Sequence, residues 1–390
     1  MDRLSLVPSL RLSPSKPRLS TSSARLYLSL RSAHLERAHA LPPAAIIFTA
    51  RRYDFDESLV EGLDLVEVSP LGAVTLLARS RLEVLEINEP LMVASLRMTA
   101  LSVAVVRLRD RLTRRRTTVV SYAIDNLDPW SAPVRAGWRP RLRRWSDRRL
   151  ARFVWKRLDR ICYGTPAAQE LYHRLMRSRR AAEALITALP VAAERDAEQQ
   201  PDPMQVVFLG AFLERKGIDR VLAAWPLVRA AVPAARLRVL GKGALEPPVL
   251  AAAAADESID VVLDPARRRI QEELLRSQVL VLPSQPTPTW REQVGLPIVE
   301  GLAAGCSVVT TTETGLASWL AAHGHSVIEP GSEPGVLAQA IVDRLRSGRP
   351  PADVLADLPP VDGRLEADRW MFARGDTPAR LEPTPITRKR

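Results

Sequence analysis

Glu292 and Glu300 lie eight positions apart, on either side of a Gly-Leu-Pro segment that begins at Gly295. The sequence around them predicts a loop, a helix over about 296–304 and then a buried strand. The first backbone N–H groups of a helix are unpaired and its macrodipole is positive at that end, so an anion such as phosphate is favoured there. This stretch therefore predicts an anion site flanked by two carboxylates.

Three other loops of the same region also follow predicted strands and combine a charged residue with a turn-forming glycine. They are Lys216-Gly217 after 205–211, Gly241-Lys242-Gly243 after 235–241, and Glu313-Thr314-Gly315 after 306–312. Each motif alone is more often a folding element, and a pair of glutamates is more often solvated. Ligands of open α/β sheets bind outside the carboxyl ends of the strands, so four such loops in sequence favour a ligand site.

The elements that must position these loops alternate between strands and helices, which predicts parallel sheets and an α/β fold. In the first half, strands are expected at 44–50, 63–68, 82–88, 117–123, 160–165 and 184–190, and helices near 70–79, 91–111, 145–158 and 165–179. In the second half, strands are expected at 205–211, 235–241, 259–264, 278–284, 306–312 and 325–330, with helices between them and at 333–346.

A polar, acidic segment with two prolines separates the two halves, and the same alternation restarts after it. We therefore expect two Rossmann-like domains that face each other. The expected divisions are a poorly defined extension over 1–40, a first domain over 41–190, a linker over 191–204, a second domain over 205–349 and a tail over 350–390. The tail has one predicted helix at 364–373, and it either packs on the first domain or stays loose.

Composition narrows the class of protein. Residues 1–200 hold 34 Lys and Arg against 21 Asp and Glu, so the net charge of +12 lies in the first half and predicts an anionic partner there. No run of 18 apolar residues predicts a membrane-spanning helix. The two cysteines, Cys162 and Cys306, lie in apolar runs without zinc spacing, so we expect buried thiols and a cytoplasmic location.

The second half resembles the retaining glycosyltransferases of family 4, also called glycosyl transferases group 1, over about 205–346. The resemblance rests on FLGAFLERKGIDRVLAAW, on RLRVLGKG, and on VLVLPS followed by EQVGLPIVEGLAAGCSVVTT, which contains the E-x7-E signature. It implies the GT-B fold, in which two Rossmann-like domains face each other across a cleft. It also implies transfer of a sugar from a nucleotide-diphosphate sugar, with retention of configuration.

The resemblance implies a role for each matching residue. Lys216 would neutralise the diphosphate, Glu292 would hold the transferred sugar, and Glu300 would bind the ribose hydroxyls. Backbone groups would meet the sugar and diphosphate at Val294, Gly295 and Leu296, and the ligand would approach the chain closely at Gly210 and Gly241. No metal or other cofactor is expected, because Lys, Arg and helix-end amides stabilise the charge. Asp54-Phe55-Asp56 spells D-x-D, but its position favours an acidic surface turn.

Two features depart from the family pattern. Ala211 stands where the family has a second diphosphate-binding arginine, and neither Arg215 nor Arg291 occupies the matching position. The first domain lacks the family's N-terminal Gly-rich loop. Acceptor-side loops are expected at EINEP (86–90) and SYAIDN (121–126), which makes Asp125 and Asn126 candidates for contacting the sugar or acceptor. A plain turn is the equal alternative for these two residues.

A basic and aromatic segment runs from Trp130 to Arg160 and holds eleven Lys or Arg residues and four Trp. A helix over 143–160 would place an apolar stripe on one side. On the other side it would place Arg148, Arg149, Arg152 and Lys156 together with Trp145. One interpretation is a solvated surface helix, and the other, of similar weight, is docking on an anionic membrane.

The first hypothesis from the sequence is a cytoplasmic glycosyltransferase that associates peripherally with the inner face of the membrane. Its donor would be a nucleotide sugar and its acceptor a glycan or a lipid-linked glycan. The alternative is a non-catalytic GT-B relative that binds a nucleotide sugar or supports a partner enzyme. A weaker third hypothesis is a binder of anionic polymers, although no nucleic-acid-binding module accompanies the basic segment and no nucleic acid is expected.

Overall fold

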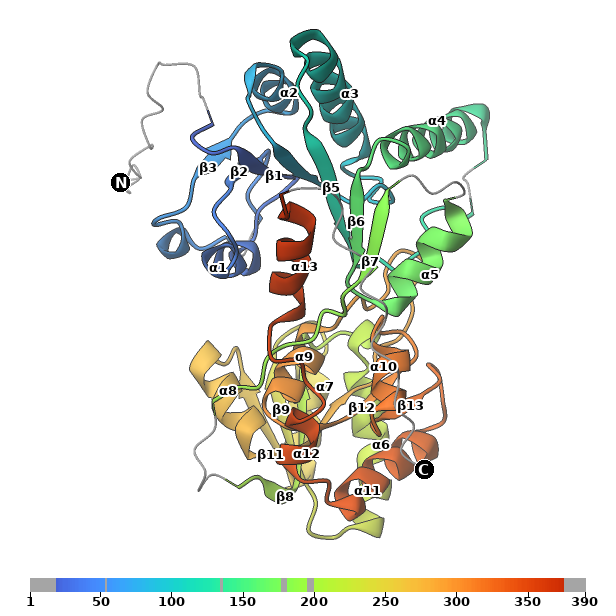
Figure 1. The fold of residues 1–390 in the computed structure, drawn as a ribbon. Coiled ribbons are helices and arrows are strands. Elements are labelled where there is room, and N and C mark those ends of the chain that lie inside the picture. Colours follow the sequence, from blue (N-terminus) through green and yellow to red (C-terminus); the bar gives the residue numbers. More distant parts are fainter. Residues whose placement is uncertain (1–18, 53–54, 134–135, 177–180, 195–199, 375–390) are drawn as a thin grey trace, which may run out of the picture.

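The computed structural model describes residues 19–52, 55–133, 136–176, 181–194 and 200–374. This part of the chain forms two α/β domains, one above the other in Figure 1. The upper, N-terminal domain has a seven-stranded sheet in the order β3-β2-β1-β4-β5-β6-β7, and the lower, C-terminal domain has a six-stranded sheet in the order β10-β9-β8-β11-β12-β13. All recorded strand pairs are parallel. The predicted architecture of two Rossmann-like domains is confirmed.

The N-terminal domain alternates strands and helices along the chain. Its strands are β1 (Ser23–Tyr27), β2 (Ala45–Phe48), β3 (Leu65–Glu67), β4 (Val84–Ile87), β5 (Thr118–Ala123), β6 (Arg160–Tyr163) and β7 (Ala182–Leu185). Its helices are α1 (Ser32–Ala40), α2 (Pro70–Arg79), α3 (Leu96–Thr113), α4 (Trp138–Trp155) and α5 (Pro166–Leu175), with a 3-10 turn η1 (Glu57–Leu59).

The C-terminal domain repeats this pattern. Its strands are β8 (Asp202–Leu209), β9 (Arg236–Gly241), β10 (Ile259–Leu263), β11 (Ser277–Leu282), β12 (Ser307–Thr311) and β13 (Ser326–Ile328). Its helices are α6 (Ile218–Ala231), α7 (Glu246–Ala255), α8 (Arg267–Arg276), α9 (Leu296–Ala303), α10 (Ala317–Ala322) and α11 (Pro334–Ser347), with a 3-10 turn η2 (Glu214–Lys216). Two more helices follow, α12 (Pro351–Leu355) and α13 (Gly363–Phe372).

Helix starts in this chain follow from local chemistry. Thr165 precedes α5, and its Oγ1 accepts a hydrogen bond from the Ala168 N–H at 3.1 Å. Ser69 caps α2 in the same way through the Gly72 N–H at 3.1 Å. Each cap is followed by a proline, whose missing N–H costs nothing in the first turn.

The strand order places a topological switch point in each sheet. In the C-terminal domain, β8 lies between β9 and β11, and the chain leaves β8 toward one side and later returns on the other. In the N-terminal domain, β1 lies between β2 and β4 in the same way. Loops that follow the two strands of a switch point splay apart and leave a crevice, which is where open α/β sheets bind ligands.

The expected extension over 1–40 is wrong for residues 19–40, because β1 is an interior strand of the sheet and α1 follows it. The apolar pattern of β1 is interrupted by Arg25, which is 2% exposed. A buried arginine in a central strand removes the apolar run that predicts such strands. Residues 1–18 lie outside the described part of the chain. The expected linker over 191–204 is also too long, since β8 begins at Asp202.

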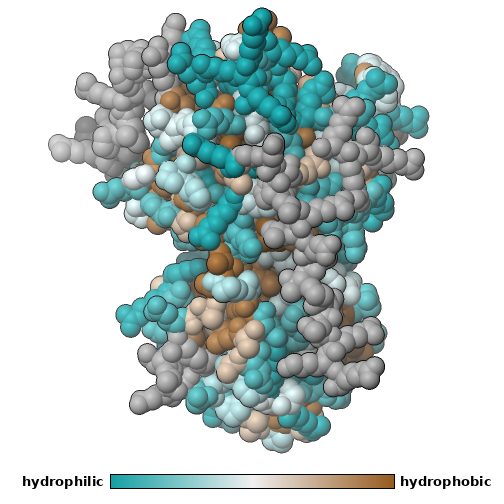
Figure 2. All heavy atoms as spheres, viewed as in Figure 1, coloured by the Kyte–Doolittle hydropathy of each residue, from teal (hydrophilic) through white to brown (hydrophobic). Residues whose placement is uncertain are grey.

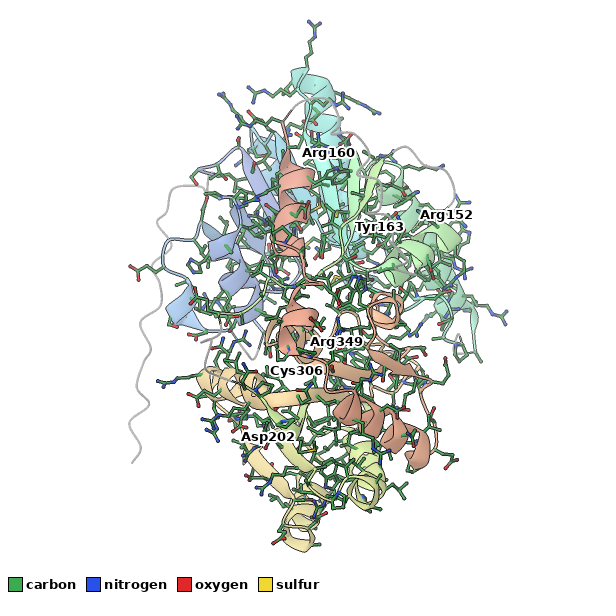
Figure 3. All side chains as sticks on the ribbon, turned by 60° about the horizontal axis from the view of Figure 1, so that its bottom comes forward. Arg152, Arg160, Tyr163, Asp202, Cys306 and Arg349 are labelled. Carbon is green, nitrogen blue, oxygen red and sulfur yellow. The ribbon has the colours of Figure 1, made fainter. Side chains whose placement is uncertain are left out.

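The tail packs on the N-terminal domain, which is the first of the two alternatives. Helix α13 lies against β5 and β6 (Figure 1). Its Trp370 and Met371 join a buried cluster with Val84, Val120 and Cys162. The Arg160 guanidinium lies beside α13 (Figure 3) and donates to the carbonyl oxygens of Met371, at 3.0 Å, and of Ala373, at 2.7 Å. Cys162 and Cys306 are buried free thiols, as predicted.

Four buried ions join α13 to the centre of the first sheet. Arg25 of β1 contacts Glu86 of β4 at 3.2 Å and Asp368 of α13 at 3.0 Å. Arg364 of α13 contacts the same Glu86 at 2.6 Å and the same Asp368 at 3.3 Å. The four side chains are between 0 and 7% exposed and carry no net charge together. We call this group the four-ion ring.

Replacing Asp368 with alanine should destabilise the protein by about 3–5 kcal/mol, because it leaves Arg25 and Arg364 buried with one carboxylate between them. The measurement is the free energy of unfolding in urea. The matched control is Glu67→Ala, which removes the partner of Arg51 in an exposed pair of similar length, 2.9 Å, and should cost less than about 1 kcal/mol. Equal effects of the two substitutions would contradict a structural role for the four-ion ring.

Candidate active site

The switch point of the second sheet brings Lys216 and Glu292 together. Lys216 ends the turn η2 after β8, and Glu292 lies in the loop after β11. The Lys216 Nζ lies 2.5 Å from Glu292 Oε2, and the Ser284 hydroxyl donates to the same oxygen at 2.9 Å. The side chains of Lys216 and Glu292 are 12% and 9% exposed, respectively. The sequence analysis expected both residues at one ligand site, and the structure brings them into direct contact although they lie 76 positions apart in the chain.

Gly217 allows the two loops to approach. Its φ is +75°, and a Cβ at this position would lie 2.2 Å from the carbonyl oxygen of Pro283. A side chain would therefore push the start of α6 away from the end of β11 and separate Lys216 from Glu292. Gly241, at the end of the neighbouring strand β9, likewise allows a close approach to the loop after β8, because a Cβ there would lie 1.9 Å from the carbonyl oxygen of Gly210.

The ring of Trp290 lies next to Lys216 of this pair and to a second cation, Arg215. The guanidinium of Arg215 lies 4.2 Å from the centre of its ring, and the Lys216 ammonium lies 5.1 Å from it. Arg291, in contrast, is engaged by Glu313 through two contacts of 2.9 Å. Ala211 stands where the family has a second arginine, and Arg215 or Arg291 would have to replace its charge. Of these two, Arg215 lies on the same tryptophan ring as Lys216.

Helix α9 begins at the predicted place, with Gly295 as its N-cap. Gly295 has a φ of +81°, and a Cβ built on it would lie 3.5 Å from the Glu292 side chain. The start of α9, including Val294 and Leu296, thus lies beside the ion pair. Pro297 has no N–H, and the Ile298 and Val299 N–H groups donate to the Gly295 carbonyl oxygen, so the start of α9 offers an anion the Leu296 N–H and the positive end of the helix dipole.

Glu300 lies one turn inside α9, as predicted, and it has a protein partner that the sequence analysis did not single out. Its carboxylate pairs with Arg267 of α8 and is 18% exposed. Lys216 and Glu292 form one contact pair, and Glu300 with Arg267 forms another. The sequence offered no signal for Arg267, because α8 reaches Glu300 only through the folded arrangement of the domain.

The first domain reaches this site through Asn126, which follows β5 and is 5% exposed. Its Nδ2 donates to the carbonyl oxygen of Glu292 at 2.9 Å and to that of Glu313 at 3.2 Å. The two domains therefore face each other at the carboxyl ends of their strands. The side-chain amide of Asn126 therefore links the two domains, whereas the alternative interpretation gave this residue only a role in a turn.

Glu89 adds a partly buried carboxyl group on the same side. It lies in the EINEP segment after β4 and accepts hydrogen bonds from the Ile124 and Asp125 N–H groups, both at 3.3 Å. Burial, followed by the neighbouring Asp125 carboxylate, raises the pKa of Glu89 to about 8. Burial also raises the pKa of Asp125, while a hydrogen bond with the Gln293 side chain of the other domain opposes the rise. Perturbed acids in a domain interface mark a candidate site.

The comparisons with known proteins agree with this geometry. Residues 203–347 match the family model described as Glycosyl transferases group 1. The match spans most of the C-terminal domain and includes Lys216, Glu292 and Glu300. A search of curated protein sequences found no match.

Solved structures with the same fold extend the comparison to both domains. WaaG, a glycosyltransferase involved in lipopolysaccharide biosynthesis, is 16% identical, with a TM-score of 0.54 over 90% of this chain and 100% of WaaG. HepE from Anabaena, solved in complex with UDP, is 13% identical, with a TM-score of 0.60 over 90% of this chain and 95% of HepE. WaaB, a lipopolysaccharide outer core galactosyltransferase, is 8% identical, with a TM-score of 0.59 over 88% and 98%. At these identities the likeness shows the GT-B fold alone.

The basic helix α4 lies at the outer end of the GT-B fold, away from the domain interface (Figure 1). It starts at Trp138, earlier than expected, and buries Ala151 and Val154. Arg148, Arg149 and Arg152 are exposed, and Arg152 points outward in Figure 3. Trp145 is 53% exposed, with the Arg149 guanidinium 4.3 Å from its ring centre. None of the described helices is both long and apolar enough to cross a membrane.

The D-x-D sequence has no place in the site. Asp54 lies outside the described residues, and Asp56 caps the turn η1 by accepting a hydrogen bond from the Ser58 N–H at 2.8 Å. This local role agrees with the acidic surface turn that the sequence favoured.

Glu89 should make stability depend on pH. Its folded pKa, about 8, lies above its ordinary value of 4.5, so the folded state holds a proton that the unfolded state releases. This contribution is fully present below pH 4.5 and is lost as the pH rises toward 8, at up to about 1.4 kcal/mol per pH unit. Glu89→Gln should flatten the fall of the unfolding free energy in this range, and Glu83→Gln, an exposed control, should not. Parallel curves for all three proteins would contradict a protonated Glu89.

Proposed function

We propose that the protein is a glycosyltransferase that moves a sugar from a nucleotide-diphosphate sugar to an acceptor hydroxyl, with retention of configuration. The observation that carries this proposal is the pair of Lys216 and Glu292 at the N-terminus of α9, on the switch point of a GT-B domain. A cation, a carboxylate and a helix N-terminus in contact suit a substrate that carries both a diphosphate and a sugar.

In this proposal, Lys216, Arg215 and the N-terminal end of α9, through its dipole and the Leu296 N–H, stabilise the charge that develops on the leaving diphosphate. These groups are held before the reaction by Trp290 and Gly217, so little reorganisation is needed when the charge appears. No step of this proposal requires a metal ion. Lys216 contacts both Glu292 and the diphosphate, and Glu292 holds the hydroxyls of the transferred sugar. Glu300, which lies one turn inside α9 and pairs with Arg267 of α8, binds the ribose.

The acceptor enters from the first domain. Glu89 and Asp125 lie where that domain meets Gln293, and a protonated Glu89 can donate a hydrogen bond while Asp125 accepts one. An acceptor hydroxyl held there would approach the sugar from the same side as the departing diphosphate, which is the arrangement that retention requires. The acceptor in this proposal is a glycan or a lipid-linked glycan.

Lys216→Ala should lower the rate of sugar transfer or donor hydrolysis by roughly a hundredfold to a thousandfold, as for removal of one charge-stabilising group. Glu292→Ala should abolish turnover of the donor. The assay is release of nucleoside diphosphate from UDP-, GDP- and ADP-sugars, after thermal shift has identified which donor raises the melting temperature. The control is Arg268→Ala, because Arg268 forms an exposed pair with Glu272 at 2.9 Å within α8.

Equal turnover in the control and in Lys216→Ala would contradict the proposed site. A donor that raises the melting temperature of the wild type without any turnover would favour the non-catalytic alternative, in which the same site binds a nucleotide sugar and supports a partner enzyme.

We further propose that α4 holds the protein on an anionic membrane, where a lipid-linked acceptor would lie. Each basic residue near such a surface contributes about 1 kcal/mol. The triple substitution of Arg148, Arg149 and Arg152 with glutamine should therefore weaken binding to vesicles of phosphatidylcholine and phosphatidylglycerol by roughly a hundredfold. Sedimentation with the vesicles measures this binding.

The matched control replaces three exposed arginines of the other domain, Arg236, Arg268 and Arg276, with glutamine. It removes the same charge but leaves α4 unchanged, so vesicle binding should stay close to that of the wild type. If the two triple variants lose binding equally, the net charge of the protein acts and α4 has no special role.

A further inference from the structure

A polar cavity lies in the first domain, where the C-terminal ends of α3 and α4 meet. Its volume is about 700 Å³. Six cations and two aspartates line it, with one leucine: Arg107, Asp110, Arg111, Arg115, Arg116, Lys156, Arg157, Leu158 and Asp159. In Figure 2, hydrophilic side chains cover this outer end of the domain, over α3. The strands of the first sheet start here, so the cavity is at the opposite end of the domain from the proposed donor site.

The positive charge of the cavity exceeds its negative charge by four. The two aspartates already have partners, since Asp110 pairs with Arg109 at 2.6 Å and Asp159 with Arg107 at 2.6 Å. Within the described residues, no ion pair is recorded for the other lining cations except a 3.9 Å contact of Arg116 with Asp159. Burial, and then the neighbouring Arg111 and Arg107, lower the pKa of Arg157. The guanidinium groups are thus close enough to repel one another.

Helix dipoles compensate only part of this charge. Basic residues near a helix C-terminus interact favourably with its negative end, which is equivalent to about half an elementary charge. Two such ends meet here, after Thr113 and after Trp155, and together they offset about one of the four excess charges. An anion bound in the cavity would neutralise the positive charge that remains.

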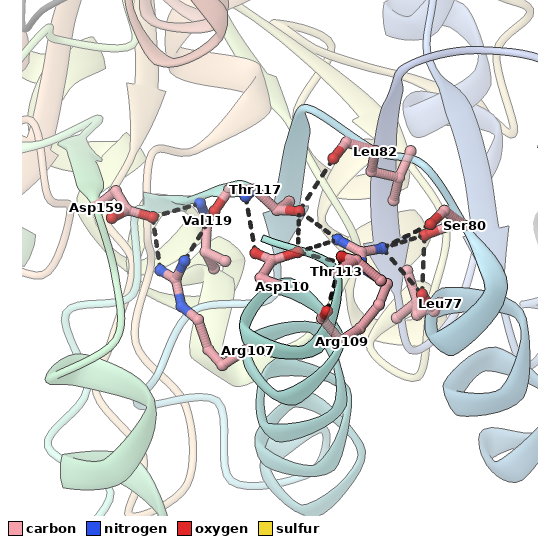
Figure 4. A network of polar contacts seen from close by, with 10 residues as sticks. All are labelled: Leu77, Ser80, Leu82, Arg107, Arg109, Asp110, Thr113, Thr117, Val119 and Asp159. Atoms are coloured by element: carbon pink, nitrogen blue, oxygen red, sulfur yellow. Dashed lines mark hydrogen bonds and ion pairs between the residues drawn. The ribbon is translucent and has the colours of Figure 1, made fainter. Parts of the chain in front are cut away.

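The floor of the cavity is fixed by a buried polar network (Figure 4). Asp110 accepts a hydrogen bond from the Thr117 N–H at 2.8 Å, and Arg109 donates to the carbonyl oxygen of Leu77 at 3.0 Å. Arg107 donates to the carbonyl oxygen of Thr117 at 2.8 Å while it pairs with Asp159. Because these groups are held by α2, α3 and β5, the cavity keeps its shape, and binding an anion does not require the site to order first.

We propose that this cavity binds a ligand with a diphosphate or two neighbouring phosphate groups, at a site separate from the donor site. Guanidinium groups match phosphate oxygens through paired N–H donors, and three or more excess charges call for more than one phosphate. Lys156 belongs both to the cavity and to the basic face of α4. The phosphates can therefore come from a lipid headgroup or from a soluble phosphorylated compound. The inference does not depend on the proposed transfer reaction.

The test measures binding of inorganic pyrophosphate to the full chain by titration calorimetry. Arg111→Gln with Arg115→Gln should weaken this binding by roughly twentyfold to thirtyfold, since each basic residue contributes about 1 kcal/mol. Both residues are exposed, so the melting temperature should not change. Lys216→Ala should leave this binding event intact, which separates it from any binding of pyrophosphate at the donor site.

The matched control is Arg97→Gln with Arg139→Gln, which removes two exposed arginines from the other ends of the same two helices. If the control weakens binding as much as the cavity variant, or if the cavity variant binds like the wild type, the inference is overturned.

Vesicles identify the source of the phosphates once the cavity variant has lost binding. If pyrophosphate displaces the wild type from phosphatidylcholine vesicles that contain phosphatidylglycerol, and the cavity variant binds them weakly, the ligand is a lipid headgroup. If vesicle binding is the same for both proteins, the ligand is soluble. Both results support the cavity as a phosphate site.

Discussion

The four-ion ring is the constraint on which the arrangement of this protein depends. Arg25 and Glu86 stand on the two central strands of the first sheet, and Arg364 and Asp368 arrive from the last helix. Charges this deeply buried are tolerated only when each has its partners, so α13 must lie on the first sheet. The chain then crosses the boundary between the domains twice, once before the C-terminal domain in the sequence and once after it. This double crossing limits how far the two domains can move apart.

Both domains use the same strand order, and this explains where the chemistry gathers. Lys216 and Glu292 follow the two strands that flank the switch point of the second sheet, and Glu89 follows β4, which flanks that of the first. The carboxyl ends of both sheets point to the shared boundary, where Asn126 joins them. The basic cavity lies at the opposite end of the first domain, so this cavity and the domain interface occupy different ends of one sheet.

The sequence predicted the second domain well because each of its longer strands keeps a run of apolar residues, such as VVFL in β8 and VLVL in β11, and its loops carry glycine beside charge. Lys216 and Glu292 could be found in this way, since their spacing within successive strand-loop-helix units determines their position. The first strand could not, because Arg25 interrupts its apolar pattern and is stabilised by residues more than 300 positions away. The partner of Glu300 and the raised pKa of Glu89 depend likewise on contacts and burial that exist only in the folded chain.

The place of α13 has a consequence for how the protein is made. Domains generally fold in order as they leave the ribosome, and the six strands of the second sheet come from one continuous segment of the chain. The first domain emerges earlier, yet it lacks Arg364 and Asp368 until the second domain has been synthesised. Until then Arg25 and Glu86 share the centre of a sheet with only each other as ionic partners. The domain that is translated first is therefore the last to be completed.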